Sequence, residues 1–128
     1  MNWTIECLQE HGIVQVKTSG QMKWDDKIKL SEELLEAGRK NNVNTFLVDS
    51  KETPFGLSVI EIDRLPAKLK EMGYDIKDRI AILVNPDFQN KGLLRFLQNV
   101  AVLSNLQIRV FADPEEATDW LKAKSNKP

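Results

Sequence analysis

The chain has 128 residues, and its 18 basic and 19 acidic side chains leave a formal net charge of -1. This length suits one domain with a single hydrophobic core, and the near-neutral charge provides no basic surface for a nucleic-acid backbone. With one cysteine, Cys7, the chain cannot form an internal disulfide, which fits a reducing compartment. No apolar run approaches the ~20 residues that cross a bilayer, and the N-terminus lacks the pattern of a signal peptide. We therefore expect a cytoplasmic protein that binds no nucleic acid and has no stable membrane insertion.

The chain opens with two alternating segments. In residues 3–9 and 13–20 apolar and polar side chains alternate, and a short connection containing His11 and Gly12 joins them. Alternation on both sides of a short, glycine-containing turn predicts an antiparallel hairpin. We expect His11 to be exposed in the turn and Cys7 to be a small buried hydrophobe.

A helical pattern follows the hairpin. Residues 24–41 carry apolar side chains at helical spacing. Asp25 or Asp26 is suited to cap the first turn, and Arg39 and Lys40 lie at the opposite end, where cations are favoured.

Three short apolar runs, at residues 45–49, 79–84 and 107–111, do not alternate. Such runs are typical of strands that are buried on both faces, as in a parallel sheet.

Three more helical patterns separate or follow these strands. The first contains Pro66, so we expect that helix to kink or to split in two. The second spans about residues 87–104. The third spans residues 115–122, and the Asp113-Pro114 pair before it is typical of a helix start.

The resulting order, β-β-α-β-α-β-α-β-α, predicts a single α/β domain over residues 1–123, followed by a flexible tail over residues 124–128. Its sheet is mixed and mostly parallel, with an N-terminal β-hairpin and about four helices.

Three short sequences carry a family resemblance. They are "FLVD" at residues 46–49, "RIAILV" at 79–84 and the closing "IRVFADPEEATDWL" at 108–121. In this order they resemble the STAS domain (sulfate transporter and anti-sigma factor antagonist), and within it the bacterial SpoIIAA-like group. The resemblance implies a sheet packed against helices, no enzyme chemistry in the domain, and a function exercised by binding a partner.

The resemblance also implies a place for a phosphoserine. In anti-sigma factor antagonists a kinase phosphorylates a serine in an Asp-Ser-(Ser/Ala)-Gly-Leu motif at the start of the helix after the third strand. Here the corresponding stretch is "DSKETPFGLS", in which Gly56 and Leu57 match the end of the motif. Pro54 and Phe55 stand where the acidic and serine residues are expected. The chain thus resembles these regulators without their usual phosphoserine motif.

The hydroxyl residues of this stretch have structural interpretations. Ser50 follows Asp49 at a strand end and is suited to bond local backbone groups in a turn. Ser58 with Glu61 three residues later predicts a helix capping box, although a phosphate at Ser58 would also be stabilised by the helix N-terminus. The sequence leaves open whether Ser50, Thr53 or Ser58 is phosphorylated.

Catalytic and metal-binding patterns are absent from the sequence. His11 is the single histidine and is expected far from Ser50, and no GxSxG motif occurs. No zinc-ligand spacing or glycine-rich phosphate loop is present. We therefore predict no catalytic residue, no metal and no cofactor.

Two features favour binding. Ligands of open α/β sheets bind beyond the carboxyl ends of the strands, and the loops there define a candidate ligand or partner site. Its residues are Asp49, Ser50, Thr53, Phe55, Gly56, Leu57, Ser58 and Asn85. The second feature is the segment 88–103, which is apolar around more than one helical face, so that Leu94 and Phe96 are candidates for a homodimer or partner interface. There, Leu94→Glu or Phe96→Glu is expected to change the oligomeric state without unfolding the chain.

Two functional hypotheses follow. The first is a non-enzymatic regulatory or protein-binding module, whose partner the sequence does not identify. The alternative is a carrier or sensor of a small apolar or lipid-like ligand, bound between the sheet and the helices. A flat apolar patch or a two-fold contact would favour the module, and a buried apolar cavity would favour the carrier.

Overall fold

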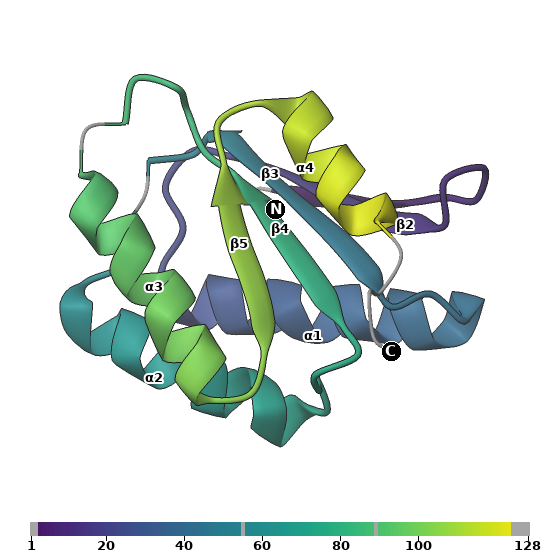
Figure 1. The fold of residues 1–128 in the computed structure, drawn as a ribbon, viewed down its shortest axis with the longest axis horizontal. Helices are drawn as coiled ribbons and strands as arrows, with labels where there is room; N and C mark the ends of the chain where they lie inside the picture. Colours follow the sequence, from purple (N-terminus) through teal and green to yellow (C-terminus); the bar gives the residue numbers. More distant parts are fainter. Residues whose placement is uncertain (1–2, 55, 89, 124–128) are drawn as a thin grey trace.

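A sheet with helices on both faces forms the body of the protein (Figure 1). The computed structural model describes residues 3–54, 56–88 and 90–123. The elements in chain order are β1 (Trp3–Leu8), β2 (Ile13–Ser19), α1 (Trp24–Asn41), β3 (Thr45–Glu52), α2 (Val59–Met72), β4 (Arg79–Leu83), α3 (Lys91–Leu103), β5 (Gln107–Phe111) and α4 (Pro114–Lys122). This order and the mixed, mostly parallel sheet confirm the predicted fold class.

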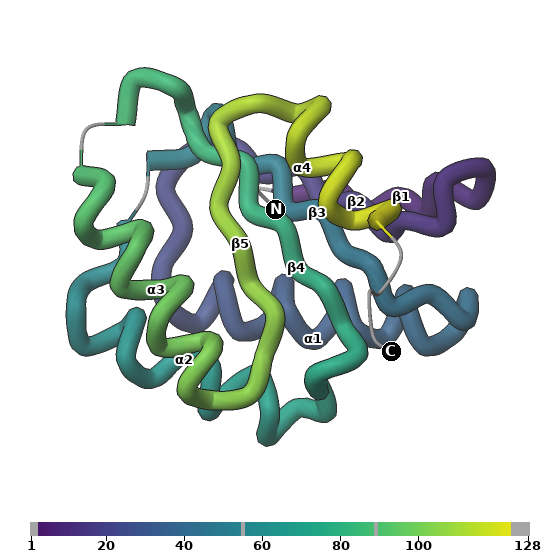
Figure 2. Tube along the Cα trace, in the orientation of Figure 1, coloured from purple at the N-terminus to yellow at the C-terminus, as the bar shows by residue number. Residues whose placement is uncertain are grey.

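The sheet topology decides which face each helix covers. The strands lie in the order β1-β2-β3-β4-β5, with β1 antiparallel to β2 and the remaining pairs parallel. Because consecutive parallel strands advance in one direction and their crossovers are right-handed, α1, α2 and α3 all lie on one face. Helix α4 follows the last strand and packs on the opposite face, against β3, β4 and β5 (Figures 1 and 2).

Each face has its own apolar core. The core of the three-helix face includes Phe46, which is fully buried and meets Tyr74 edge-on with ring centroids 5.5 Å apart. The core under α4 includes Leu47, Ala117 and Leu121. Since Phe46 and Leu47 are neighbours on β3, the two cores follow from the alternation of side chains along a strand.

Two expectations about the helices are corrected, at Pro66 and at the start of α3. Of the kink or split expected at Pro66, the split is wrong, because α2 is one continuous helix from Val59 to Met72 in which Pro66 is buried. Lys23 is the N-cap residue of α1, and Asp26 contributes to the cap, as expected, by accepting a hydrogen bond from the Lys23 backbone N–H at 3.1 Å.

Helix α3 begins at Lys91, not near residue 87. The Asn85 side chain accepts a hydrogen bond from the Asp87 backbone N–H at 2.8 Å, which folds the segment after β4 into a turn. Asn90 then caps the helix by accepting from the Leu93 backbone N–H. Among the described residues, no helix has the length and apolar character needed to span a membrane.

Candidate functional site

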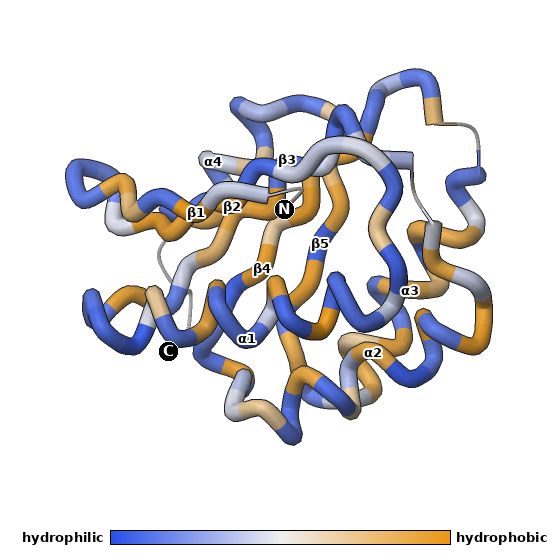
Figure 3. Tube along the Cα trace, turned by 180° about the vertical axis from the view of Figure 1, so that it is seen from behind, coloured by the Kyte–Doolittle hydropathy of each residue, from blue (hydrophilic) through white to orange (hydrophobic). Residues whose placement is uncertain are grey.

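An apolar cavity of about 120 Å³ lies between the sheet and the helices α1 and α2. Helix α1 lines it with Leu30 and Leu34, helix α2 with Leu65 and Leu69, and β4 with Ile80. Leu30 and Leu34 lie one helical turn apart, so both project from the same face of α1. In Figure 3, polar and apolar segments alternate along α1, while β4 and β5 carry apolar segments.

Hydroxyl groups along the cavity are engaged by other protein atoms. Thr18 Oγ1 and Thr53 Oγ1 are 2.6 Å apart, and Ser50 Oγ donates to the backbone oxygen of Leu83 at 2.6 Å. The Tyr74 hydroxyl donates to the backbone oxygen of Ser31 at 2.7 Å. Burial raises the pKa of Tyr74, so its hydroxyl stays protonated at neutral pH. Because these hydroxyl groups already bond protein atoms, a ligand in the cavity would contact mostly apolar side chains.

Lys27 is the one cation among the described residues that line this cavity. It lies in the first turns of α1, and its Nζ donates to the backbone oxygen of Met22 at 2.9 Å. Burial lowers the pKa of Lys27, while the negative charges of Glu61 and Asp26 act in the opposite direction. A partly desolvated ammonium group thus adjoins an otherwise apolar space.

The volume sets the size of a possible ligand. A cavity of ~150 Å³ holds benzene, and sites for drug-sized ligands occupy ~300–1,000 Å³. At about 120 Å³, this cavity has room for a small ring or a short alkyl chain.

A second hollow lies at the carboxyl edge of the sheet. It measures about 450 Å³ and is lined by residues of the β3–α2 and β4–α3 connections, including Lys51, Thr53, Pro54 and Asn85. Asn85 Nδ2 donates to the backbone oxygen of Lys51 at 3.5 Å, which joins the two connections. Thr53 and Pro54 line both hollows, so one loop separates the apolar cavity from this groove at the sheet edge.

The structure divides the predicted site residues into several groups. Ser50, Thr53, Gly56 and Leu57 line the apolar cavity, and Thr53 and Asn85 line the groove at the sheet edge. Phe55 lies outside the described residues.

Asp49 and Ser50 do not act together. They are consecutive residues of β3, so their side chains lie on opposite faces of the sheet. Ser50 was expected in a local turn, which is wrong: β3 continues to Glu52, and Ser50 bonds the neighbouring strand. Asp49 instead accepts from the Lys51 backbone N–H at 3.3 Å.

Ser58 caps α2 as predicted. Its Oγ accepts from the Glu61 backbone N–H at 3.2 Å, and the Glu61 carboxylate accepts from the Ser58 backbone N–H at 3.1 Å. The capping box is therefore confirmed.

The two interface candidates are partly buried. Phe96 packs against the larger core, so Phe96→Glu is now expected to destabilise the fold. Leu94 is half-buried. The most exposed apolar side chains of α3 are instead Val102 and Leu103, at 72% and 87%.

Sequence reasoning missed Lys27. A signal was present, because Lys27 lies three and seven residues before Leu30 and Leu34 and so falls on the apolar stripe of α1. A lysine within such a stripe lies against the core unless its ammonium group reaches solvent.

Solved structures define the fold. The chain is similar to the anti-sigma factor antagonist SpoIIAA in its unphosphorylated form, with 14% identity and a TM-score of 0.55, over 95% of this chain and 99% of that chain. It is also similar to an uncharacterised protein of the DUF3478 family with a SpoIIAA-like fold from Shewanella loihica, with 25% identity and a TM-score of 0.56, over 93% and 91%. No family model and no curated protein matches the chain. The protein therefore has the STAS/SpoIIAA-like fold that its sequence resembles.

Proposed function

We propose that this chain is a non-enzymatic binding domain that carries or senses a small apolar ligand in the cavity between the sheet and α1 and α2. The cavity is the observation that carries this proposal, because an apolar hollow between the sheet and the helices favours a carrier over a module that acts through a flat surface.

The energetic cost of the cavity supports a use for it. Protein interiors are packed as densely as organic crystals and contain few voids larger than a water molecule. Enclosed cavities in engineered cores cost ~24 cal/mol per Å³, so about 3 kcal/mol is the upper bound for this space of about 120 Å³, which is partly open to solvent. This is a large fraction of the stability of a small domain, and a bound apolar ligand would recover part of it.

The proposal assigns no catalytic step to the cavity. Ser50 Oγ is engaged by the Leu83 backbone oxygen, and His11 is exposed in the turn between β1 and β2. Nucleophilic catalysis by a serine needs a base within hydrogen-bond reach, and the described residues bring no histidine to Ser50.

The test is a titration with toluene, followed by backbone amide NMR. We expect shifts at residues around the cavity, such as Leu30 and Leu65, and none at Ala117 under α4. In Ser31→Leu the new side chain occupies the cavity, and the shifts should disappear. Absence of binding by toluene and by the acids and alcohols described below would overturn the proposed function.

A protein partner or a second copy of the chain is the other candidate, and one surface favours it. Val59 and Ile60, at the start of α2, are 59% and 65% exposed and directly follow the loop that lines the cavity. If they form an interface, sedimentation velocity should show association of the wild type that Ile60→Glu abolishes. A wild-type chain that stays monomeric over a wide concentration range would argue against self-association.

A further inference from the structure

We infer that the ligand of the apolar cavity is a small monocarboxylic acid whose carboxylate binds Lys27 and whose apolar body fills the space beyond it. This inference rests on the proposed function and specifies the chemistry of its ligand.

The ammonium group of Lys27 has unused hydrogen-bonding capacity. An ammonium group has three N–H donors, and one of them is directed at the backbone oxygen of Met22 at 2.9 Å. Among residues 3–54, 56–88 and 90–123, no carboxylate lies within 4.0 Å of Lys27 Nζ, and no further acceptor is within hydrogen-bond distance. Two donors therefore remain available to a ligand.

The neighbouring carboxylates are occupied elsewhere. Asp26 Oδ2 accepts from the Lys23 backbone N–H at 3.1 Å, and Glu61 Oε1 accepts from the Ser58 backbone N–H at 3.1 Å. Both carboxylates are parts of helix caps, and moving either one to Lys27 would open its cap. Their charges act on Lys27 from a distance without forming an ion pair with it.

A free anion would complete this arrangement. A desolvated charge without a partner is costly, and a carboxylate that accepts from an ammonium group forms a short, strong hydrogen bond. The ligand's carboxylate would supply the negative charge that the described residues do not place at Nζ.

Gly56 leaves space beside Lys27. A Cβ atom on Gly56 would lie 3.5 Å from Lys27 Nζ, and the backbone of Gly56 is outside the left-handed region that favours glycine. Local backbone geometry therefore does not require glycine here. The absence of a side chain keeps one side of the ammonium group uncovered.

The single cation and the small volume select the ligand class. One ammonium group matches the single charge of a carboxylate, whereas a phosphate monoester carries about -1.5 to -2 and is held by several donors. The cavity of about 120 Å³ suits a ring or a short chain rather than a long acyl chain.

The test compares acids with neutral analogues of similar shape. Benzoate is paired with benzyl alcohol and hexanoate with hexan-1-ol, and binding to the wild type at pH 7 is measured by NMR titration or calorimetry. A hydrogen bond to a charged group is worth enough to give the acids about tenfold tighter binding or more.

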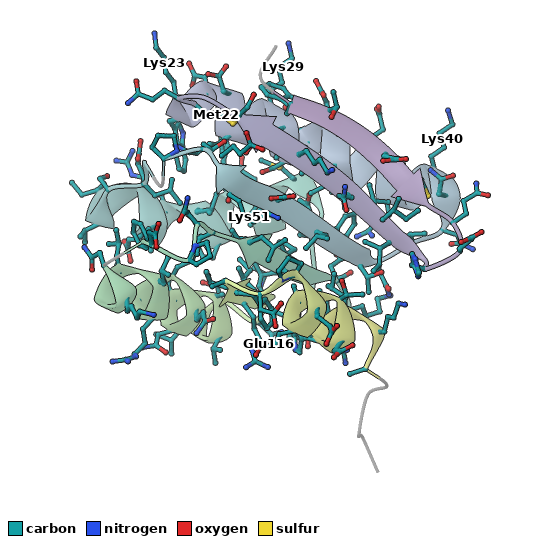
Figure 4. All side chains as sticks on the ribbon, turned by 90° about the horizontal axis from the view of Figure 1, so that it is seen from above. Met22, Lys23, Lys29, Lys40, Lys51 and Glu116 are labelled. Atoms are coloured by element: carbon teal, nitrogen blue, oxygen red, sulfur yellow. The ribbon has the colours of Figure 1, made fainter. Side chains whose placement is uncertain are left out.

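Three variants assign this preference to Lys27. Lys27→Met should lose the preference for acids while still binding the alcohols, and Lys27→Arg should retain much of it. Lys29→Met is the matched control, because Lys29 lies on the same helix, is exposed and points away from the domain (Figure 4). It should bind all four probes as the wild type does, and circular dichroism should show that every variant is folded.

Each failure has a distinct meaning. Equal binding of acids and alcohols by the wild type, or an acid preference that survives Lys27→Met, would overturn the inference and leave the proposed function intact. Tighter binding of hexyl phosphate than of hexanoate would overturn the assignment of a carboxylate. Absence of binding by these probes and by toluene would overturn both proposals.

Discussion

Two basic side chains of α1 lie against the body of the domain, and they differ in their partners. Arg39 donates from both terminal nitrogens to Asp78, at 2.9 and 2.8 Å, and the Asp78 side chain is 1% exposed. Asp78 also accepts from the Asp75 backbone N–H at 2.9 Å. Lys27 is paired with a backbone oxygen only. We interpret Arg39 as a structural residue and Lys27 as a binding residue.

Removal of the Arg39 guanidinium should destabilise the fold. In Arg39→Gln the buried Asp78 loses its counter-charge, and because the Arg39 side chain is 44% exposed and screened by solvent, the loss should be about 1–3 kcal/mol. Urea denaturation would measure the loss. Lys40→Gln, an exposed neighbour at the end of α1 (Figure 4), should remain within about 0.5 kcal/mol of the wild type. Equal stability of Arg39→Gln and Lys40→Gln would contradict the structural assignment.

The charge of Lys27 should weaken the unliganded fold. Because burial lowers its pKa from the ordinary 10.5, the folded chain holds this proton less tightly than the unfolded chain. The charged Lys27 therefore lowers the free energy of unfolding at pH values below its pKa in the folded chain. This loss disappears as the pH rises to 10.5, the ordinary pKa of the unfolded chain.

Lys27→Met should therefore be more stable than the wild type at pH 7. The gain in the free energy of unfolding should be no more than about 1 kcal/mol, because solvent screens a half-exposed charge. This advantage should shrink as the pH is raised. Paired urea denaturations of the two proteins, from pH 7 upward, give the difference in the free energy of unfolding. A difference that stays constant with pH would show that the charge of Lys27 has no such effect.

The helices illustrate how local signals and packing compete. The capping box of α2 and the Asp113 cap of α4 form as their sequences predict, because both depend on residues two or three positions apart. Pro66 is a strong local signal for a break, and packing overrides it. Gly38 shows the opposite effect. Glycine lowers the helix propensity of α1, but the close approach of the Phe46 ring from β3 leaves no room for a larger residue.

Gly38→Ala should destabilise α1 although alanine is the better helix former by ~1 kcal/mol. A Cβ at Gly38 would lie 2.5 Å from the ring of Phe46, which is fully buried. Overpacking of this kind costs about 1–3 kcal/mol, and the gain in helix propensity offsets about 1 kcal/mol of it, so the net loss should be up to about 2 kcal/mol in thermal or urea unfolding.

Gly92→Ala provides the comparison for that loss. It lies near the start of α3, and its nearest neighbour would be at an ordinary 3.7 Å. This substitution should be neutral or stabilising. If Gly38→Ala were equally neutral, the close contact between α1 and Phe46 would be refuted.

The arrangement of the helices explains why the cavity lies where it does. Three helices share one face of the sheet and α4 covers the other; α1 packs against β1, β2 and β3, α3 packs against β5, and α2 lies between α1 and α3. Small or short side chains under the junction of α1 and α2, among them Ser31 and Val48, leave the space unfilled.

Filling the cavity should raise the stability of the fold while abolishing ligand binding. Ser31→Leu places an apolar side chain in the space and keeps the backbone oxygen that accepts from Tyr74. The free energy of unfolding should rise by about 1 kcal/mol, or a few degrees in Tm, while binding of toluene and hexanoate is lost.

Thr118→Leu is the matched control for this substitution. Thr118 lies on α4, and like Ser31 its hydroxyl donates to a backbone oxygen four residues earlier. The variant should bind as the wild type does. Undiminished binding by Ser31→Leu would place the ligand outside the cavity.

The order of strands and helices followed from the sequence alone, because hydrophobic periodicity and caps are properties of neighbouring residues. The same holds for the two-sided burial of β3 and β4, which their continuous apolar runs predicted. For β5 that expectation is wrong, because β5 is an edge strand in which Ile108 is buried and Arg109 is exposed. The positions of Asp49 and Ser50 on opposite faces also follow from the sequence, because successive side chains of a strand alternate between the two faces of the sheet.

The cavity and its cation required the folded chain. Thr18, Leu65 and Ile108 line one space although they are far apart in the sequence, and no local pattern measures the volume left between them. The same applies to Ser50, whose partner Leu83 is brought alongside only by strand pairing. Volume and partner choice depend on long-range packing, whereas periodicity and capping depend on residues within one or two turns. For this reason the fold was predictable from the sequence, and so were several loop residues that line the cavity, whereas the volume of the cavity and its cation, Lys27, were not.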